Sequence, residues 1–269
     1  MEWPTGPHHA ITRTVRDSAA LLDATSGPEA GDPYVAPTHE GSYLQVLDRP
    51  VQHLRVAFQT ITHDGAAVHP SVAEAVLDAA ALLVDLGHEV EEARPSIDVS
   101  AMQRAVRIIV ASNAANALQM RSLAVRRPMQ EADVESITWQ WSREGLRYSG
   151  QELAWAVNTI HSVGRRLGHF LGRYDVLLTP TMPEPPLPLG TVNMGSRDLD
   201  GYFEALCHHT AFTAIYNCAG IPAANVPLVW HEGLPVGVQI AGPLGADARL
   251  LNLAAQLESA RPWSDHRPK

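Results

Sequence analysis

"LRVAFQT" (residues 54–60) and "HPSVAEAVLDAAALLVDLGHEV" (residues 69–90) together decide the fold class. The first stretch is apolar and has the length of a strand, and the second begins near Pro70, which suits the first turn of a helix. One face of that helix carries apolar residues at helical spacing, namely Val72, Ala75, Val76, Ala79, Leu83 and Leu86. Gly87 ends the helix, and "HEVEEA" (88–93) has the pattern of a second strand. Strand, helix and strand in such close succession predict parallel pairing and an α/β fold.

The last third of the chain combines a short strand, a proline-rich loop and a hairpin. Val176–Leu178 is the predicted strand, and the loop that follows it, "TPTMPEPPLPLG" (179–190), is stiffened by its prolines. Ligands of α/β proteins often bind at the carboxyl ends of strands, which makes this loop a candidate ligand-binding segment. "IPAANVPLVW" (221–230) and "PVGVQIAG" (235–242) are predicted to pair as a hairpin with Gly233 in the turn.

Further helices are predicted from capping residues and apolar spacing. One covers residues 14–27, with Thr14 as the N-cap and Gly27 as the stop. Residues 198–220 are predicted to form one helix, and residues 247–260 another with Asp247 at its cap.

The middle of the chain, from about Val99 to Tyr174, is predicted to be mostly helical, with breaks near Arg127–Pro128 and near Tyr148–Gly150. Three tryptophans fall in this region, at positions 139, 141 and 155. Large aromatic residues usually pack between helices, and we expect that role here. The alternative is that one or two of them line a pocket for an apolar substrate.

Composition excludes several classes of protein. The 269 residues are 45% hydrophobic and 18% charged, as in a globular chain. The formal net charge of −9 argues against nucleic acid or an anionic membrane surface as a partner, because both favour dense Lys and Arg. Cys207 and Cys218 lack a CxxC spacing and are expected to be buried residues in a reducing compartment. Without an apolar run of roughly 18–20 residues or a secretory leader pattern, we expect a cytoplasmic protein.

Residue patterns typical of a catalytic site are missing from the sequence. HExxH does not occur, and the adjacent pairs His8–His9 and His208–His209 are expected to point in different directions, so no metal site is predicted. The GxSxG elbow and the phosphate-binding P-loop are also missing. Lys269 is the only lysine, which leaves no good residue for a lysine-based mechanism. The residues alone therefore predict no cofactor and no recognisable catalytic group, although a Ser-His-Asp arrangement formed in space stays open.

Three stretches, in this order, resemble the amidase signature family of serine amide hydrolases. They are "TRTVRDSAALLDATSG" (12–27), "YDVLLTPTMPEPPLPLG" (174–190) and "FTAIYNCAGIPAANVPLVWHEGLPVGVQIAGPLGADARLLNLAAQLE" (212–258). All three look like the C-terminal half of the family. The resemblance implies one α/β domain over residues 1–269, the C-terminal portion of a mixed, twisted β-sheet flanked by helices on both faces.

The same resemblance implies a chemistry for the intact family. A Gly/Ser-rich segment that precedes the region resembling residues 12–27 supplies the nucleophilic serine, a second serine and the oxyanion-hole donors, and a lysine lies further upstream. This sequence has no counterpart of that equipment, so the chain is expected to be an N-terminally truncated amide hydrolase, inactive by itself. Residues 139–181 look closest to bacterial amidases that cleave small linear or cyclic amides, such as nylon-oligomer hydrolases.

The resemblance also implies substrate-binding positions. Thr179 and Thr181 lie where the proline-rich loop would approach the active cleft, and Phe212, Ile215 and Asn217 lie where a helix would line the acyl pocket. Ordinary core packing is the alternative for Phe212 and Ile215. For Asn217 the alternative is a buried amide that binds backbone groups. Gln239, on the last strand, is expected to be structural.

Two other functions stay open beside the truncated hydrolase. The chain could be a non-catalytic module that pairs with a separate N-terminal half or that holds a small apolar amide without cutting it. The protein partners left open are that N-terminal half and, in a homo-oligomer, a second copy of the chain. More distantly, it could be a subunit of a tRNA-dependent amidotransferase. In either case part of a larger sheet would leave an unpaired strand edge, so we expect poor solubility or self-association of the isolated chain.

Overall fold

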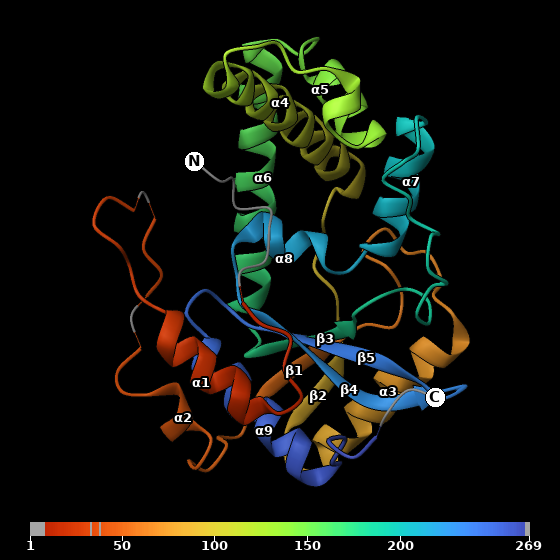
Figure 1. Cartoon of the computed structure of the whole chain (residues 1–269). Helices are drawn as coiled ribbons and strands as arrows, with labels where there is room; N and C mark the ends of the chain where they lie inside the picture. The colour runs from red at the N-terminus through yellow and green to blue at the C-terminus, as the bar shows by residue number, and fades with distance from the viewer. Residues whose placement is uncertain (1–8, 33, 38, 267–269) are drawn as a thin grey trace.

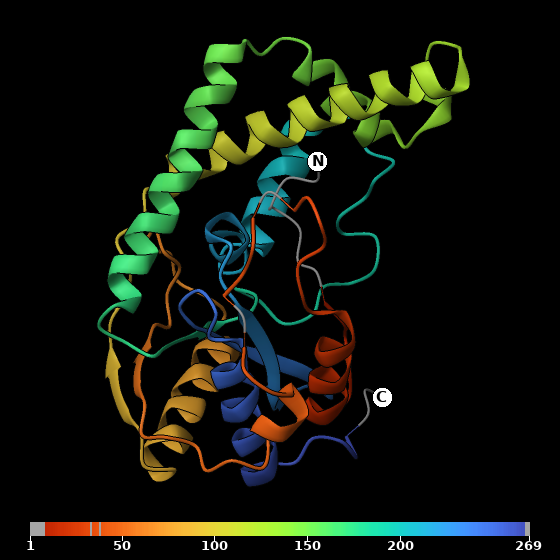
Figure 2. The same ribbon diagram turned by 90° about the vertical axis from the view of Figure 1, so that its left-hand side faces the viewer.

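The computed structural model describes residues 9–32, 34–37 and 39–266. Figures 1 and 2 show a β-sheet with helices packed around it and a group of long helices that extends away from it. The helices, in chain order, are α1 Val15–Thr25, α2 Tyr43–Val46, α3 Pro70–Asp85, α4 Val99–Val125, the 3₁₀ helix η1 Glu131–Asp133, α5 Ser136–Gly145, α6 Gly150–Leu171, α7 Leu199–His209, α8 Ala214–Ala219 and α9 Asp247–Ala260. None of these helices is both long and apolar enough to cross a bilayer.

The sheet of the described chain has five strands in the order β2-β1-β3-β5-β4. They are β1 Arg55–Phe58, β2 Glu89–Glu92, β3 Val176–Pro180, β4 Ala223–His231 and β5 Leu234–Ala241. Strand β1 pairs in parallel with both β2 and β3, whereas β5 pairs antiparallel with β3 and with β4. The α/β class and the mixed sheet are therefore confirmed.

The predicted strand–helix–strand unit forms as expected. Helix α3 begins at Pro70, and the side chain of the N-cap His69 accepts a hydrogen bond from the backbone N–H of Ser71. The predicted apolar face is buried, apart from the half-buried Leu86. Gly87 has φ +92°, a left-handed conformation that lets the chain leave the helix and enter β2.

Helices cover both faces of the sheet, because alternate residues of each strand point to opposite sides. Val56, Val176 and Leu178 belong to a core shared with α1, α3 and α9. Ala57 and Leu177 belong to a second core, shared with α4, α6 and α8. The strands are thus sandwiched between two apolar layers, as the family resemblance implied.

The hairpin of β4 and β5 lies at one edge of the described sheet, and β4 is its outermost strand. Glu232 and Gly233 form its turn with φ of +50° and +80°, the left-handed pair that suits the twist of two antiparallel strands. The pairing shifts between Val226 and Val229, where Pro227 interrupts the strand. A proline is tolerated there because β4 is an edge strand of the described sheet.

Two helix predictions need correction. The single helix expected over residues 198–220 divides into α7 and α8, with a turn at 210–213 where Thr210 caps α7. The turn between the two helices places Phe212 in the core, where it has no exposed surface. Helix α7, by contrast, contains no buried residue. Helix α9 begins with Asp247, but its N-cap is Ala246. Asp247 therefore acts in the first turn, where a negative charge is favourable at the positive end of the helix dipole.

The helical region has its breaks where the sequence predicted them. Arg126 adopts a left-handed conformation at the end of α4, just before Arg127–Pro128, and Ser149 caps α6. Trp141 is buried and packs edge-on against Phe203 of α7, with ring centroids 5.6 Å apart. The other two tryptophans are more exposed: Trp139 is half-buried and Trp155 lies at the surface under the guanidinium of Arg104.

An ion-pair cluster joins three of the helices. Arg107 of α4 donates from Nε and from one terminal nitrogen to the two carboxylate oxygens of Glu144 in α5, at 2.6 and 2.7 Å. The same terminal nitrogen lies 2.5 Å from Asp200 of α7, and the hydroxyl of Tyr148 donates to Glu144 at 2.6 Å. The two-point contact with Arg107 lowers the pKa of Glu144.

A close backbone contact between α4 and α5 predicts opposite effects for two glycines. A Cβ at Gly145 would overlap the carbonyl group of Ala111, whereas a Cβ at Gly168, exposed on α6, would meet nothing within 4 Å. We expect Gly145→Ala to destabilise the chain by about 1–3 kcal/mol. We expect Gly168→Ala to stabilise it by about 0.5–1 kcal/mol. Urea unfolding measures both, and a neutral Gly145→Ala would contradict the described contact.

The Arg107–Glu144 pair predicts a stability change with pH. The pKa of Glu144 is lower in the folded chain than its usual 4.5, so its stabilising effect is present above that pH. The effect is lost as pH falls through the folded-state pKa. We therefore expect Glu144→Gln to lower stability at neutral pH and the deficit to shrink as the pH falls below 4.5. Urea midpoints across this range test it, with exposed Glu74→Gln as the control; a deficit that does not vary with pH would argue against the assignment.

Candidate functional site

A cavity of about 450 Å³ lies between α4, α7, the turn before α8 and the loop that follows β1. Its apolar lining comes mainly from Val99, Met102, Val106, Phe203, Leu206, Ala211 and Ala214. The polar and charged lining residues are Thr62, His63, Asp64, Gln103, Arg107, Asp200, Glu204, Cys207, His208 and Thr210. A mainly apolar cavity of this volume with a few polar groups is typical of a small-molecule site.

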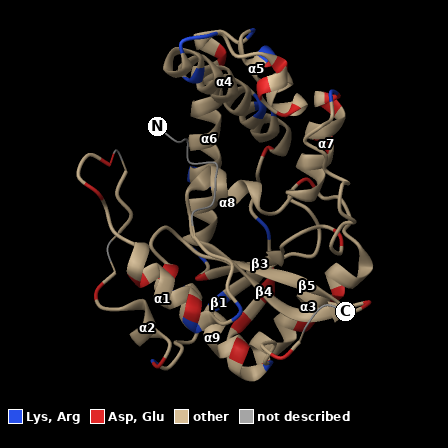
Figure 3. Ribbon diagram, viewed as in Figure 1, with Lys and Arg blue, Asp and Glu red and all other residues tan. Residues whose placement is uncertain are grey.

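Charged residues lie beside the cavity and do not form one basic surface. In the view of Figure 3, the arginines are scattered among acidic residues over several helices. Arg107, which lines the cavity, has its charge paired with Glu144 and Asp200. The guanidinium is therefore already committed to two carboxylates, and the cavity carries little free positive charge from it.

His63 is a buried, neutral histidine in the cavity wall. Only 6% of its surface is exposed, and burial lowers its pKa to about 4, with Asp64 opposing the change. Its Nδ1 accepts a hydrogen bond from Nε2 of Gln59 at 3.3 Å, which leaves the proton on the Nε2 of the neutral ring. That Nε2 has no partner within the described chain. The edge of the Phe212 ring packs against the imidazole, with centroids 5.8 Å apart.

The two cysteines are poor nucleophiles in this environment. Burial raises the pKa of Cys207, which lines the cavity, to about 11, and that of Cys218 to about 12. Both therefore stay protonated near neutral pH, and the thiol lacks the reactive thiolate form. The cavity thus has no activated cysteine.

None of the five predicted substrate residues belongs to the described lining of the cavity. Thr179, Phe212 and Ile215 have no exposed surface, and Asn217 is half-buried on α8. The hydroxyl of Thr179 donates to the carbonyl of Pro180 at 2.8 Å, and that of Thr181 donates to Oδ1 of Asn225 at 2.6 Å. Phe212 reaches the cavity wall indirectly, through its contact with His63.

A buried polar group at the end of β3 was not predicted. The hydroxyl of Tyr216 lies 3.4 Å from Oγ1 of Thr179, and burial raises the pKa of this tyrosine above its ordinary value. Gln239 pairs with Thr179 across β3 and β5 and interacts with the same tyrosine. Its own Nε2 has no partner among the described residues. Polar residues at strand ends, including Gln59 and His63 after β1, are the sequence signal that could have located this group.

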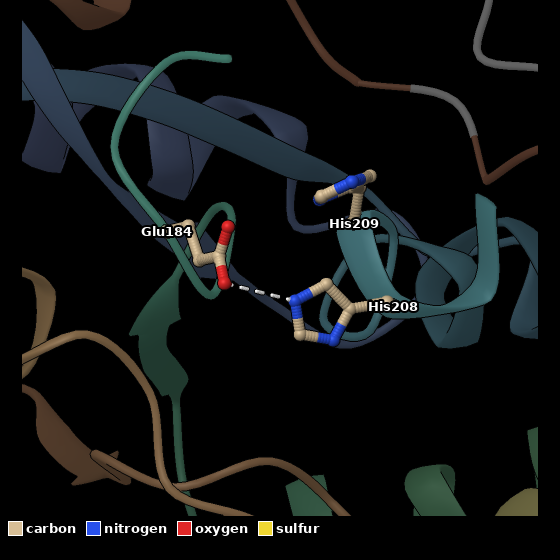
Figure 4. A group of neighbouring side chains, drawn as sticks. All are labelled: Glu184, His208 and His209. Carbon is tan, nitrogen blue, oxygen red and sulfur yellow. Dashed lines mark hydrogen bonds and ion pairs between the residues drawn. The ribbon is translucent and has the colours of Figure 1, made fainter. Parts of the chain in front are cut away.

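A third feature is a set of metal-ligand side chains beside the cavity. Glu184, in the proline-rich loop, and His208 and His209, at the end of α7, have donor atoms that all lie within 4.8 Å of one another (Figure 4). The rings of the two histidines meet edge to face with centroids 5.0 Å apart. The expectation that these adjacent residues point apart is therefore wrong for this pair.

The chain matches the protein-family model named Amidase over residues 7–251. It is 33% identical to 6-aminohexanoate-cyclic-dimer hydrolase from Pseudomonas sp. (strain NK87), over 96% of this chain and 54% of that protein. It is 30% identical to an acylamidase from Rhodococcus erythropolis, over 97% of this chain and 54% of the relative. The chain thus spans about half the length of the curated relatives that it matches.

Solved structures give the same picture. A structure of 6-aminohexanoate cyclic dimer hydrolase complexed with substrate superposes with a TM-score of 0.88 and 32% identity, over 95% of this chain and 55% of that one. A bacterial aryl acylamidase of the amidase signature family has the same fold, with a TM-score of 0.80, 23% identity and coverage of 95% of this chain and 53% of that one. The residues that match the family model, 7–251, include all five strands of the described sheet and the helices between them. The chain therefore belongs to the amidase family.

Proposed function

We propose that this chain provides the substrate-pocket half of a hydrolase that cleaves the carbon–nitrogen bond of small linear or cyclic amides. The observation that carries the proposal is the similarity, over 95% of the chain, to a 6-aminohexanoate cyclic dimer hydrolase whose structure was solved with its substrate. In this proposal the lysine and serines that form and release the acyl-enzyme come from the part of the relatives that this chain does not span. The sequence supports that division, because Lys269 is its only lysine.

The cavity supports an uncharged, largely apolar substrate. Its apolar walls suit methylene groups, and the neutral ring of His63 adds no charge that would have to be desolvated. Arg107 is neutralised by its two carboxylate partners and so does not select an anionic ligand. A small amide with an aliphatic body fits this combination.

The predicted substrate residues would act in two ways. Thr181 and Asn217 lie outside the described lining but keep some accessible surface, and we propose that they contact a part of the bound amide that extends beyond the cavity. Thr179, Phe212 and Ile215 are fully buried, so they would shape the pocket from behind. Phe212 illustrates the second role, since its ring packs against His63 in the cavity wall.

The edge of the sheet offers a place for the second half to attach. Strand β4 pairs with β5 on one side only, within the described sheet. An unpaired edge can accept a further strand, and we propose that the catalytic half binds there in the assembled enzyme. The same edge is the reason that we expect the isolated chain to self-associate.

Complementation tests the proposed function. The purified chain alone should hydrolyse no 6-aminohexanoate cyclic dimer and should not be labelled by a fluorophosphonate probe, which reacts with activated serines. Co-expression with the N-terminal part of the Pseudomonas relative that this chain does not span should restore both hydrolysis and labelling. Labelling of a serine within this chain would contradict the division of roles, and a complex that binds the amide without cutting it would favour a binding module.

Filling the cavity tests where the substrate binds. Ala211→Phe places a ring beside the lining residues, and we expect it to weaken amide binding in the complemented enzyme at least about tenfold, a cost of about 1.4 kcal/mol. Ala117→Phe, at an exposed position on α4, is the matched control and should leave binding unchanged. The apparent KM measures the effect, and equal KM values for the two variants would remove the cavity from the substrate path.

A further inference from the structure

Three side chains outside the proposed chemistry come together at the end of α7. Glu184 extends from the loop after β3, and His208 and His209 are the last two residues of the helix. Figure 4 shows that the three side chains, which come from these two segments, are neighbours. One carboxylate oxygen of Glu184 lies 3.2 Å from Nε2 of His208, and every pair of donor atoms in the set lies within 4.8 Å.

We propose that Glu184, His208 and His209 bind a divalent transition-metal ion of the Zn²⁺ type. Two imidazoles and one carboxylate form a donor set that suits zinc and its neighbours in the first transition row. Zinc–nitrogen bonds of about 2.0–2.1 Å place tetrahedral ligand atoms roughly 3.3–3.4 Å apart. Because the donor atoms lie within 4.8 Å of one another, they must approach by up to about 1.4 Å to hold the ion. Solvent or a ligand group would fill the remaining coordination position.

The backbone on both sides of the site is held in place. Glu184 lies between Pro183 and Pro185, which fix the backbone around it, and the carbonyl of Pro183 accepts a hydrogen bond from the backbone N–H of His69 at 2.8 Å. The histidines belong to the last turn of an ordered helix. We expect the contraction to come from side-chain rotation, because the side chains of Glu184 and His208 are about half exposed and have room to move.

A second observation also indicates a ligand at this site. The Nδ1 atom of His209 is buried and has no hydrogen-bond partner in the described chain. A buried polar atom without a partner is uncommon in folded proteins, and such an atom often binds an ion or a water molecule. Glu184 supplies the negative charge that a cation requires, and it already faces His208.

Binding here would join the proline-rich loop to a wall of the cavity. His208 itself lines the cavity, and Cys207 and Leu206, in the same turn of α7, line it too. An ion that bridges Glu184 and the histidines would hold that turn against the loop. Because a ligand that binds only the folded state stabilises it, the ion should raise the melting temperature of the chain.

Metal titration of the full chain tests the site. Equilibrium dialysis with Zn²⁺ should give one bound ion per chain, and Co²⁺ should give the visible absorption of a low-symmetry site with nitrogen ligands. Zn²⁺ should also raise the melting temperature. His208→Ala and Glu184→Gln should each weaken Zn²⁺ binding at least about tenfold and abolish most of that rise.

The controls separate this site from others. His169→Ala removes an exposed histidine on α6 and should leave both measurements unchanged. Far-UV circular dichroism checks folding, and Glu184→Gln changes one exposed loop side chain, so it tests the site even if a histidine variant folds poorly. Absence of stoichiometric Zn²⁺ binding, or equal affinity in the wild type and both ligand variants, would overturn the proposal.

Discussion

Strand β3 is the constraint on which the rest of the structure depends. All five of its residues are buried, and it pairs in parallel with β1 and antiparallel with β5. It therefore joins the strand–helix–strand unit of the first third to the hairpin of the last third. Its alternating side chains also fix the two cores, since Val176 and Leu178 face one layer of helices and Leu177 faces the other. A one-residue shift in its register would exchange these faces and disrupt both layers.

The carboxyl end of β3 lies at the same end of the sheet as the candidate site. Beyond Pro180 the proline-rich loop begins, and β1 sends Gln59 and His63 to the same end of the sheet. Above this end, α4 and α7 enclose the cavity, with Arg107 tied to carboxylates on two neighbouring helices. The loop after β1 thus lines the cavity at this end of the sheet, while most other lining residues come from α4 and α7, and α4 itself packs in one core with Ala57 and Leu177 of the sheet. Both helices contribute apolar and polar side chains to the lining, whereas the loop after β1 contributes mainly polar ones.

Local patterns were enough to predict most of the fold. The helix from Pro70 to Leu86 and the hairpin around Gly233 follow from spacing and turn chemistry within a short stretch, and the structure has both. The division of residues 198–220 was missed because its cause is tertiary: Phe212 must enter the core, and the helix turns to let it. Asp247 was misassigned by one position because capping and first-turn roles favour the same residue types.

The site was harder to predict than the fold. Its residues come from segments far apart in the chain, and no local motif marks His63 or the pair His208–His209 as neighbours of Glu184 and the cavity. The residues that the family resemblance implied lie outside the described lining of the cavity, so their contact with a substrate stays a prediction. Residue type and spacing alone do not show which side of a helix faces an empty space, because that depends on the packing of its neighbours.

The route of the chain through the helical region has an evolutionary consequence. The polypeptide leaves the sheet after β2 and returns at β3, and those two strands flank β1. The segment between Ala93 and Asp175 therefore adds no strand to the described sheet, although its helices α4 and α6 cover one face of that sheet. Changes on the side of this segment that lines the cavity, away from the shared core, can therefore alter ligand preference between related chains while the strand pairings stay the same.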